Sequence, residues 1–313
     1  MKNQNKYYLI FLQNNCLMLL ICIIITVYLI LLFIKNNNYE TFCTLIDNNN
    51  NNNNYNYFKN NKNILISGNN FTYNSIYDNF YVSIYDFISF NENIYKEQGD
   101  IIFNLLEPYN LNIQKILLLD IMTGHLYGTI YNFPCLKIST NKNNSLCNYV
   151  KNNYNNININ KFDIINDNIN ELNKFTCITN FSNNFYYYND NELNMFFSKL
   201  NNMINTKGFL VINYIIDFNN IQMLYGSINK DKNLFFKNYK YKLISKPIEN
   251  KIEIIETINP INKINKRQNT HIFYNHNVNK LIQISKLNNF DLMKNIYNSK
   301  YKENYGFLIF QKR

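Results

Sequence analysis

Residues 116–128 read ILLLDIMTGHLYG, and this stretch decides the fold of the chain. Four apolar residues run into Asp120, and two glycines follow within eight positions. A short apolar run bounded by turn residues is typical of a buried strand. An acid followed by a tight turn into a helix is typical of the first strand of nucleotide-binding α/β folds. The turn holds Met122 and His125 where such turns usually hold glycine, so the sequence leaves open whether it accommodates a cofactor.

Helical patterns precede this stretch, and strand and helix patterns alternate after it. Such alternation predicts a mainly parallel sheet covered by helices on both faces. In the helix expected at 190–204, Asp190 is the expected N-cap, and Lys207–Gly208 is expected to end the helix. The expected helices cover 76–90, 93–106, 145–153 and 190–204, and the expected strands cover 115–121, 134–140, 157–165, 174–181 and 208–216.

The pattern changes after residue 249. Strand-like runs follow at 250–258, 270–276 and 304–312, with a helical pattern over 278–290 between the last two. Strands that follow one another without intervening helices favour antiparallel pairing. We therefore expect this part of the chain to add an antiparallel edge to the parallel sheet.

An apolar segment precedes the predicted domain. Residues 16–34 read CLMLLICIIITVYLILLFI and carry no charge. As a helix they span about 28 Å, close to the hydrocarbon thickness of a bilayer. A cleaved signal peptide has a shorter apolar core and a small-residue cleavage site, whereas Lys35 and three asparagines follow here. We therefore predict a single-pass membrane anchor, although too few basic residues flank it to fix its orientation.

Four segments make up the expected organisation of the chain. A short tail covers 1–15, the transmembrane helix covers 16–34, a flexible linker covers 35–62, and one folded domain covers 63–313. The linker contains an unbroken asparagine run at 48–54. Such a polar tract cannot bury enough apolar surface to become ordered.

Charge and cysteine content argue against two classes of function. The formal net charge is +10, but the lysines are scattered, so we do not expect a nucleic-acid-binding surface. The six cysteines form no C-x-x-C pair and only three histidines occur, which disfavours a metal site and favours buried free thiols. The abundance of Asn, Ile and Lys is typical of an A/T-rich genome, such as that of a protist or a large DNA virus.

Several short motifs stand in a fixed order along the second part of the chain. They are Tyr-Asp pairs at 77–78 and 85–86, Tyr95, Glu97, the strand that ends at Asp120, Phe175 at the start of a later strand, the helix, turn and strand of 189–210, and GFLIFQK at 306–312. In this order they resemble the class I S-adenosylmethionine-dependent methyltransferases over residues 73–313. The resemblance implies an α/β, Rossmann-like sheet of seven strands, mostly parallel with an antiparallel last strand.

The resemblance also implies where S-adenosylmethionine would bind, beyond the carboxyl ends of the strands. The family pattern is an acid followed by glycines two, four and often six residues later, so Asp120 and Gly124 match it while Met122 and Leu126 replace glycines. The second strand ends in Ser139 and Thr140, where the family has a ribose-binding carboxylate. The acid beside the adenine base corresponds to Asp163. The implied cofactor-binding residues are Asp120, Met122, Gly124, Ser139 and Asp163.

The sequence does not identify a catalytic base. His271 and His276 flank an aromatic pair, and a histidine can take a proton from an acceptor. A structural role is the commoner one for such residues. A further hypothesis places Arg267, His271 and Tyr274 around an acceptor pocket. Thr176 stands where the fourth strand of the family often has an acid.

Two functional hypotheses follow. In the first, the chain is a membrane-anchored S-adenosylmethionine-dependent methyltransferase that acts on an unknown acceptor. In the second, it is a catalytically inactive protein of the same fold that serves as an anchored structural or interaction module. Met122, Leu126 and the missing ribose acid favour the second hypothesis, and the element order with Asp120, Gly124 and Asp163 favours the first. The acceptor, the membrane and the oligomeric state do not follow from the sequence.

Overall fold

The computed structural model describes residues 68–71, 73–89, 91–154, 156–168, 174–218, 239–260, 266–301 and 304–313. All of them belong to one compact unit, residues 61–313. The predicted tail, transmembrane helix and linker over residues 1–62 lie outside the described residues, so they stay predictions. No helix within the described ranges is long and apolar enough to cross a bilayer.

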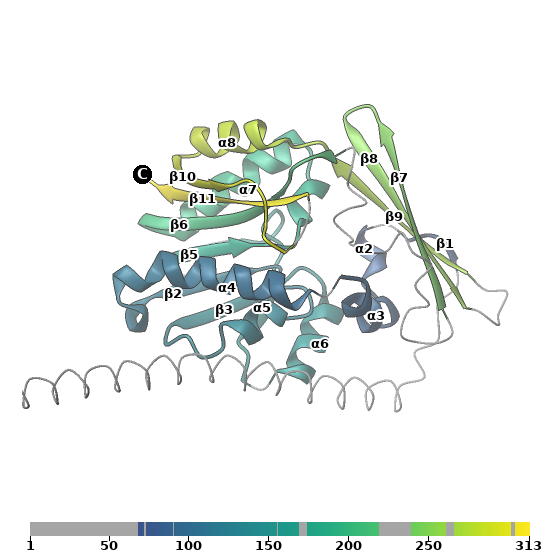
Figure 1. The fold of residues 1–313 in the computed structure, drawn as a ribbon, viewed down its shortest axis with the longest axis horizontal. Helices are drawn as coiled ribbons and strands as arrows, with labels where there is room; N and C mark the ends of the chain where they lie inside the picture. Colours follow the sequence, from purple (N-terminus) through teal and green to yellow (C-terminus); the bar gives the residue numbers. More distant parts are fainter. Residues whose placement is uncertain are drawn as a thin grey trace, which may run out of the picture. The chain divides into compact units, whose positions relative to one another are not determined.

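A seven-stranded sheet forms the centre of the fold (Figure 1). Its strands are β2 (Lys115–Leu119), β3 (Leu136–Asn141), β4 (Ile159–Lys161), β5 (Phe175–Asn180), β6 (Ile204–Ile215), β10 (Phe290–Ile296) and β11 (Tyr305–Lys312). They lie in the order β10-β11-β6-β5-β2-β3-β4. The strands from β6 to β4 pair in parallel, whereas β11 pairs antiparallel with both of its neighbours. The expectation of a mostly parallel α/β sheet with an antiparallel strand near its C-terminal end is therefore confirmed.

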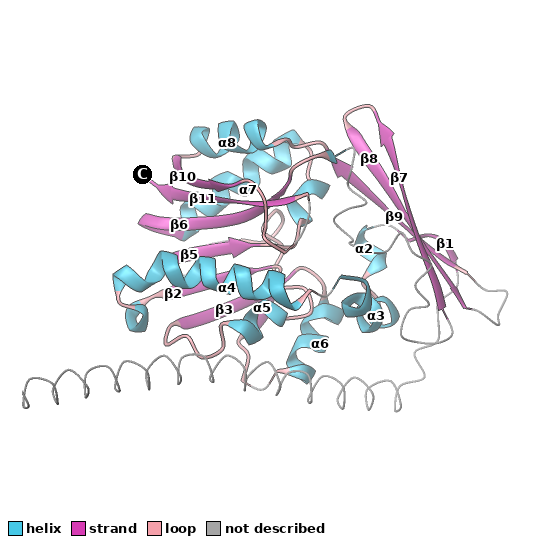
Figure 2. Cartoon of the chain, viewed as in Figure 1, coloured by secondary structure: helices cyan, strands magenta, loops and turns pink. Residues whose placement is uncertain are grey.

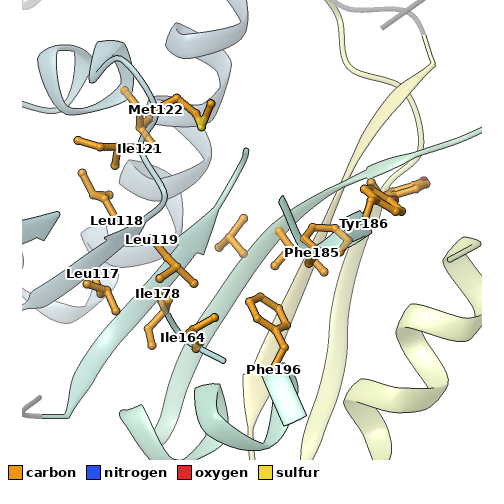
Figure 3. Close-up of a cluster of buried hydrophobic side chains, with 14 of the residues drawn as sticks. Leu117, Leu118, Leu119, Ile121, Met122, Ile164, Ile178, Phe185, Tyr186 and Phe196 are labelled. Atoms are coloured by element: carbon orange, nitrogen blue, oxygen red, sulfur yellow. The ribbon is translucent and has the colours of Figure 1, made fainter. Parts of the chain in front are cut away.

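Apolar side chains on both faces explain why β2 lies inside the sheet. Ile116, Leu117 and Leu118 are all 0% exposed, which is typical of a parallel strand covered by helices on both sides. Figure 3 shows Leu117 and Leu118 in one cluster with Ile178 and Phe196 from later parts of the chain. The flanking helices are α4 (Glu92–Leu106), α5 (His125–Thr129), α6 (Asn144–Asn153), α7 (Asp190–Met203) and α8 (Val278–Leu287).

The prediction that Asp190 caps α7 is wrong. Asn189 is the N-cap, because its side-chain oxygen accepts hydrogen bonds of 3.0 Å from the backbone N–H groups of Asn191 and Glu192. The Glu192 carboxylate accepts in turn from the N–H of Asn189 at 2.8 Å, which completes a capping box. The Asp190 side chain is 66% exposed and pairs instead with Lys280.

The prediction that Lys207–Gly208 ends α7 is also wrong. The helix passes directly into β6 at Ile204, so both residues lie inside the strand. Lys207 has a φ of 65°, and the pairing register between β5 and β6 shifts nearby. A Cβ on Gly208 would lie 2.9 Å from the carbonyl oxygens of Asn205 and Thr176. Gly208 resembles a helix-ending glycine in the sequence, but the structure requires glycine there because the strand is bulged and the backbone passes close by.

A second sheet, of four strands, lies apart from the first (Figure 2). It consists of β1 (Gly68–Phe71), β7 (Tyr239–Ile248), β8 (Lys251–Pro260) and β9 (Arg267–Tyr274), in the order β1-β9-β8-β7. The expectation that 250–258 and 270–276 extend the edge of the parallel sheet is therefore wrong, and only β10 and β11 do so. The physical reason is visible in β8, where buried and half-buried residues alternate, a pattern that suits a sheet covered on one face.

Two short helices, α2 (Tyr73–Ile76) and α3 (Asn79–Ser89), lie against this four-stranded sheet. Arg267 of β9 is fully buried and donates to Asp78 Oδ2 at 2.6 Å and to the carbonyl oxygen of Ile76 at 2.7 Å. Its guanidinium also lies over the Phe71 ring, 4.1 Å from the centroid. These contacts occupy Arg267 in holding the helices, which corrects the hypothesis that it lines an acceptor pocket with His271 and Tyr274.

Candidate functional site

The candidate site lies where the chain order of the seven-stranded sheet reverses. From β2 the chain continues to β3 and β4 on one side and then crosses to β5 and β6 on the other. Ligands of open α/β sheets bind outside the carboxyl ends of the strands at this kind of position. Two cavities, of about 480 Å³ and about 80 Å³, lie there, and Asp120 at the end of β2 lines both.

The turn after β2 holds a backbone conformation that glycine usually supplies. Asp120 and Met122 both have a φ of 54°, and Gly124 has a φ of 92°. Left-handed conformations cost non-glycine residues about 1–3 kcal/mol and cluster at functional sites. Met122 therefore keeps the turn while adding a side chain, which is 7% exposed and lies beyond the end of β2 (Figure 3).

Asn141, the last residue of β3, holds this turn in place. Its amide oxygen accepts from the backbone N–H of Met122 at 2.8 Å, and its amide nitrogen donates to the Met122 carbonyl oxygen at 2.9 Å. The N–H of Lys142 donates to Asp120 Oδ1 at 3.1 Å. Two residues at the end of β3 thus fix the positions of Asp120 and Met122.

Most of the residues that line the large cavity, of about 480 Å³, are polar. Asp163 lies 2.9 Å from Lys142 Nζ and accepts from Asn166 Nδ2 at 2.7 Å. Burial alone raises the pKa of Asp163, but the bonds with Lys142 and Asn166 bring it below its ordinary value. The cavity is lined by Tyr77, Asp120, Lys142, Asn143, Asn144, Ser145, Leu146, Lys161, Asp163, Asn166, Asp167 and Asn184.

The carboxyl group of Asp120 has a pKa well above its ordinary value. Burial raises its pKa to about 6, and the hydrogen bonds from Asn184 and the Lys142 N–H only partly oppose this effect. Its side chain is 5% exposed. A carboxyl group that changes charge near neutral pH is typical of a functional position.

The small cavity, of about 80 Å³, is lined on one side by aromatic rings. Gln98 of α4 is 3% exposed, and its amide nitrogen donates to Tyr305 Oη at 3.3 Å. Its amide oxygen has no hydrogen-bond partner among the described residues. Met122 belongs to this cavity, and its sulfur lies 3.9 Å from Asn184 Nδ2 of the large one. The lining consists of Tyr85, Ser89, Ile94, Tyr95, Gln98, Leu119, Asp120, Ile121, Met122, Leu126, Thr179, Phe181, Ser182, Asn183 and Tyr305.

A buried polar cluster ties α3 to the turn and α5. Asp86 Oδ2 lies 3.0 Å from His125 Nε2, and its carboxylate accepts from Thr123 Oγ1 at 2.5 Å and from Tyr149 Oη at 3.2 Å. Burial alone raises the pKa of Asp86, but the charge and the bond of His125 lower it overall. From the turn after β2, His125 therefore contacts a carboxylate.

The predicted cofactor-binding residues do not all reach the cavities. Asp120 lines both, Met122 lines the small one and Asp163 the large one. Gly124 lies outside both linings under Tyr154, whose Cε2 a Cβ would approach to 2.8 Å. Ser139 also lies outside both linings and is 0% exposed within β3.

Sequence reasoning missed several lining residues because it did not identify which residues beyond the strand ends reach the cavities. Thr176 is the second residue of β5, whereas the residue after this strand that lines the large cavity is Asn184. Likewise β3 runs past Thr140 to Asn141, which brings Lys142 to the cavity. The sequence signal that could have identified these lining residues is a polar residue just after an apolar run. Gln98 lies on α4, and only the helical periodicity of the sequence indicates that its side chain faces the core.

The histidines considered as acceptor bases are buried in packing contacts. His271 is 3% exposed, its Nδ1 contacts Tyr187 Oη, and its Nε2 lies 3.0 Å from Glu256 Oε2. His276 is 0% exposed, and its Nε2 lies 2.7 Å from the carbonyl oxygen of Tyr188. Both residues lie outside the linings of the two cavities, so we assign them structural roles.

The strand order, the antiparallel β11 and the cavities at the reversal point define the class I S-adenosylmethionine-dependent methyltransferase fold. No family model and no curated protein sequence matches the chain. Solved structures match it in fold, each with low sequence identity.

An S-adenosylmethionine-dependent methyltransferase from Clostridium acetobutylicum is 14% identical, with a TM-score of 0.55 over 70% of this chain and 92% of the other. The methyltransferase CcbJ from Streptomyces caelestis is 8% identical, with a TM-score of 0.56 over 70% and 90%. The amino pentose methyltransferase CalS10 from Micromonospora echinaspora, solved with bound S-adenosylmethionine, is 8% identical, with a TM-score of 0.52 over 70% and 92%.

Proposed function

We propose that this chain binds S-adenosylmethionine beside Asp120 and transfers its methyl group to an acceptor. The observation that carries the proposal is the large cavity at the reversal point of the sheet, with Asp120 and Asp163 in its lining. Its volume of about 480 Å³ falls in the usual range for small-molecule sites. The proteins of similar fold named above are themselves described as methyltransferases.

The polar lining of the large cavity fits the nucleoside part of such a ligand. Asp163 and Asn166 offer an acceptor and an amide to an adenine base. Asp120 offers a carboxylate to ribose hydroxyls, in place of the acid that is missing after β3. When bound, the donor supplies a methyl group on a sulfonium centre, so the protein mainly binds, orients and excludes water.

The acceptor and the cellular setting belong to the same proposal. An N-terminal anchor at residues 16–34 would hold the domain at a membrane, and the apolar, uncharged composition of that segment supports this placement. The acceptor is an unidentified molecule. We assign no catalytic base, because the two histidines beyond the turn have structural contacts.

Calorimetric titration of the purified full-length chain in detergent with S-adenosylhomocysteine, the demethylated product, tests the proposal. We expect saturable binding, and we expect Asp163→Asn to weaken it because the adenine would lose a charged acceptor. Asp291→Asn is the matched control, since Asp291 is exposed on β10 and pairs with Arg313. Absence of binding at high micromolar ligand would exclude the proposed function.

A second candidate is a catalytically inactive protein that uses this fold as an anchored structural or interaction module. Two observations favour it: Met122 occupies the place of a glycine with its side chain buried, and β3 ends in Asn141 and is followed by Lys142, with no carboxylate there. The titration separates the two candidates, because the inactive module has no requirement for donor binding.

A further inference from the structure

The linings of the two cavities meet at Asp120, Met122 and Asn184. Asp120 lines both cavities, whereas Met122 lines the small one and Asn184 the large one. The amide nitrogen of Asn184 donates a long hydrogen bond to Met122 Sδ, at 3.9 Å. These two side chains therefore meet at the boundary between the cavities, next to Asp120.

We propose that Met122 closes this boundary: nucleosides without an amino-acid arm bind without moving it, whereas S-adenosylmethionine and S-adenosylhomocysteine bind with the Met122 side chain displaced, which lowers their affinity. The proposal rests on the proposed function, since it concerns which ligands of the adenosine class the same site accepts. It makes Met122 a specificity-determining residue, in a turn where the family pattern has glycine.

Cavity sizes support this selection. The large cavity, at about 480 Å³, is in the range of complete small-molecule sites. The small cavity, at about 80 Å³, is far below that range. We therefore expect a ligand that fills the large cavity and extends an arm past Asp120 to displace the Met122 side chain.

The small cavity is nevertheless chemically suited to the polar end of such an arm. The amide oxygen of Gln98 has no partner among the described residues, although the side chain is 3% exposed. A buried acceptor without a partner is unfavourable, and a ligand ammonium group would satisfy it. Asp120 adds a carboxylate to the same wall. The compartment thus offers oxygen acceptors, and steric closure rather than chemistry limits access to it.

Backbone contacts confine any adjustment to the Met122 side chain. The Asn141 amide bonds both the N–H and the carbonyl of Met122, at 2.8 and 2.9 Å. A methionine side chain has three rotatable bonds and adapts to irregular space. Shortening this side chain should therefore open the boundary between the two cavities and leave the backbone of the turn in place.

The test compares two ligands that differ in the amino-acid arm, 5′-methylthioadenosine and S-adenosylhomocysteine, by calorimetry on the full-length chain. For the unmodified protein we expect 5′-methylthioadenosine to bind at least as tightly as S-adenosylhomocysteine. In Met122→Ala we expect S-adenosylhomocysteine to gain about ten-fold or more in affinity, the scale set by one or more methylenes in a pocket. The affinity for 5′-methylthioadenosine should change less than about two-fold.

Three variants sharpen the comparison. Met122→Leu keeps a side chain of similar volume and should keep the selectivity of the unmodified protein. Met195→Ala removes a methionine that is 44% exposed on α7 and should change neither affinity. Adding Gln98→Met to Met122→Ala removes the amide oxygen that would accept from the ligand ammonium group. The double variant should therefore show a smaller gain in affinity for S-adenosylhomocysteine, with no change in the affinity for 5′-methylthioadenosine. Thermal melts confirm that each variant is folded.

The outcomes are distinguishable. If both ligands bind and Met122→Ala leaves their affinity ratio unchanged, the selectivity role of Met122 is wrong while the proposed function stands. The same conclusion follows if the unmodified protein already binds S-adenosylhomocysteine about ten-fold more tightly. If neither ligand binds to any folded variant, the proposed function itself fails and the inference fails with it.

Discussion

Replacing Glu256 with glutamine is expected to loosen the four-stranded sheet from the remainder of the fold. The Glu256 carboxylate is fully buried and accepts from Tyr81 Oη at 2.8 Å, from Tyr241 Oη at 2.6 Å and from Asn269 Nδ2 at 2.9 Å. His271 Nε2 lies 3.0 Å away. These partners come from α3, β7 and β9, so one charged group joins three elements.

The size of the effect follows from the pKa of this carboxyl group. Burial alone raises the pKa of Glu256, but His271, Tyr241 and Asn269 lower it from 4.5 to about 2. At about 1.36 kcal/mol per unit, this difference stabilises the folded state by about 3 kcal/mol at neutral pH. A hydrogen bond to a charged group contributes about 1.5–3 kcal/mol, so a loss of about 3 kcal/mol is of the order expected for this carboxylate.

The pH dependence has a definite sign. Because the folded-state pKa is the lower one, the stabilisation is fully present above about pH 4.5 and is lost as the pH falls towards 2. Glu256→Gln carries no titrating group at this position. Its stability should therefore fall less steeply than that of the unmodified protein across this window.

Thermal and denaturant unfolding of the full-length chain measures both effects. A loss of about 3 kcal/mol corresponds to a fall in Tm of about 6–12 °C for a domain of this size. Glu253→Gln is the matched control, since Glu253 lies on the same strand at a half-buried position on the opposite face from the buried residues of β8. If Glu256→Gln lowers Tm no more than this control, or shows the same acid dependence as the unmodified protein, the assigned stabilising role of the charge is wrong.

Three further predictions concern the turn, α7 and β6. Asp120→Asn should stabilise the ligand-free protein at pH 7 by up to about 3 kcal/mol, because burial raises the pKa of Asp120 from 3.8 to about 6. Ionisation of Asp120 therefore lowers stability as the pH rises through that range. Denaturant unfolding from pH 4 to 7 should show a flatter stability profile for the variant than for the unmodified protein. Asn189→Ala should cost about 1 kcal/mol by denaturant unfolding, whereas Asp190→Ala should cost clearly less, and equal losses would contradict the capping assignment. Lys207→Gly should raise stability by about 1 kcal/mol, because φ is 65° there; a loss of stability would show that the bulge does not strain this residue.

The parallel sheet was predictable because its strands are apolar on both faces. ILLL before Asp120 has no polar residue to place in water, so it can only lie inside a covered sheet. The four-stranded sheet was harder to place. Its strands are recognisable by alternation, but period-two alternation does not say which sheet a strand joins. The partners that decide the matter, Arg267 with Asp78 and Tyr81 with Glu256, are separated by more than 170 residues.

The site was predictable at the residues that follow strands directly. Asp120 and Asp163 were recognisable as acids after apolar runs, and both line a cavity. Ser139 was chosen because β3 was expected to end at Thr140, one residue before its actual end. Asn141 illustrates the limit: its amide bonds the backbone of Met122, a contact 19 residues away that no local pattern encodes.

The strand order has a consequence for synthesis of the protein on the ribosome. β11 fills the interior position between β6 and β10, yet it follows both of them along the chain. Until residues 305–312 have emerged, β6 presents an unpaired edge on which the residues from Gly208 to Ile215 are all buried in the finished fold. Such an edge favours aggregation or pairing with other chains. Nascent chains arrested between β10 and β11 should therefore be the species that most requires chaperone protection.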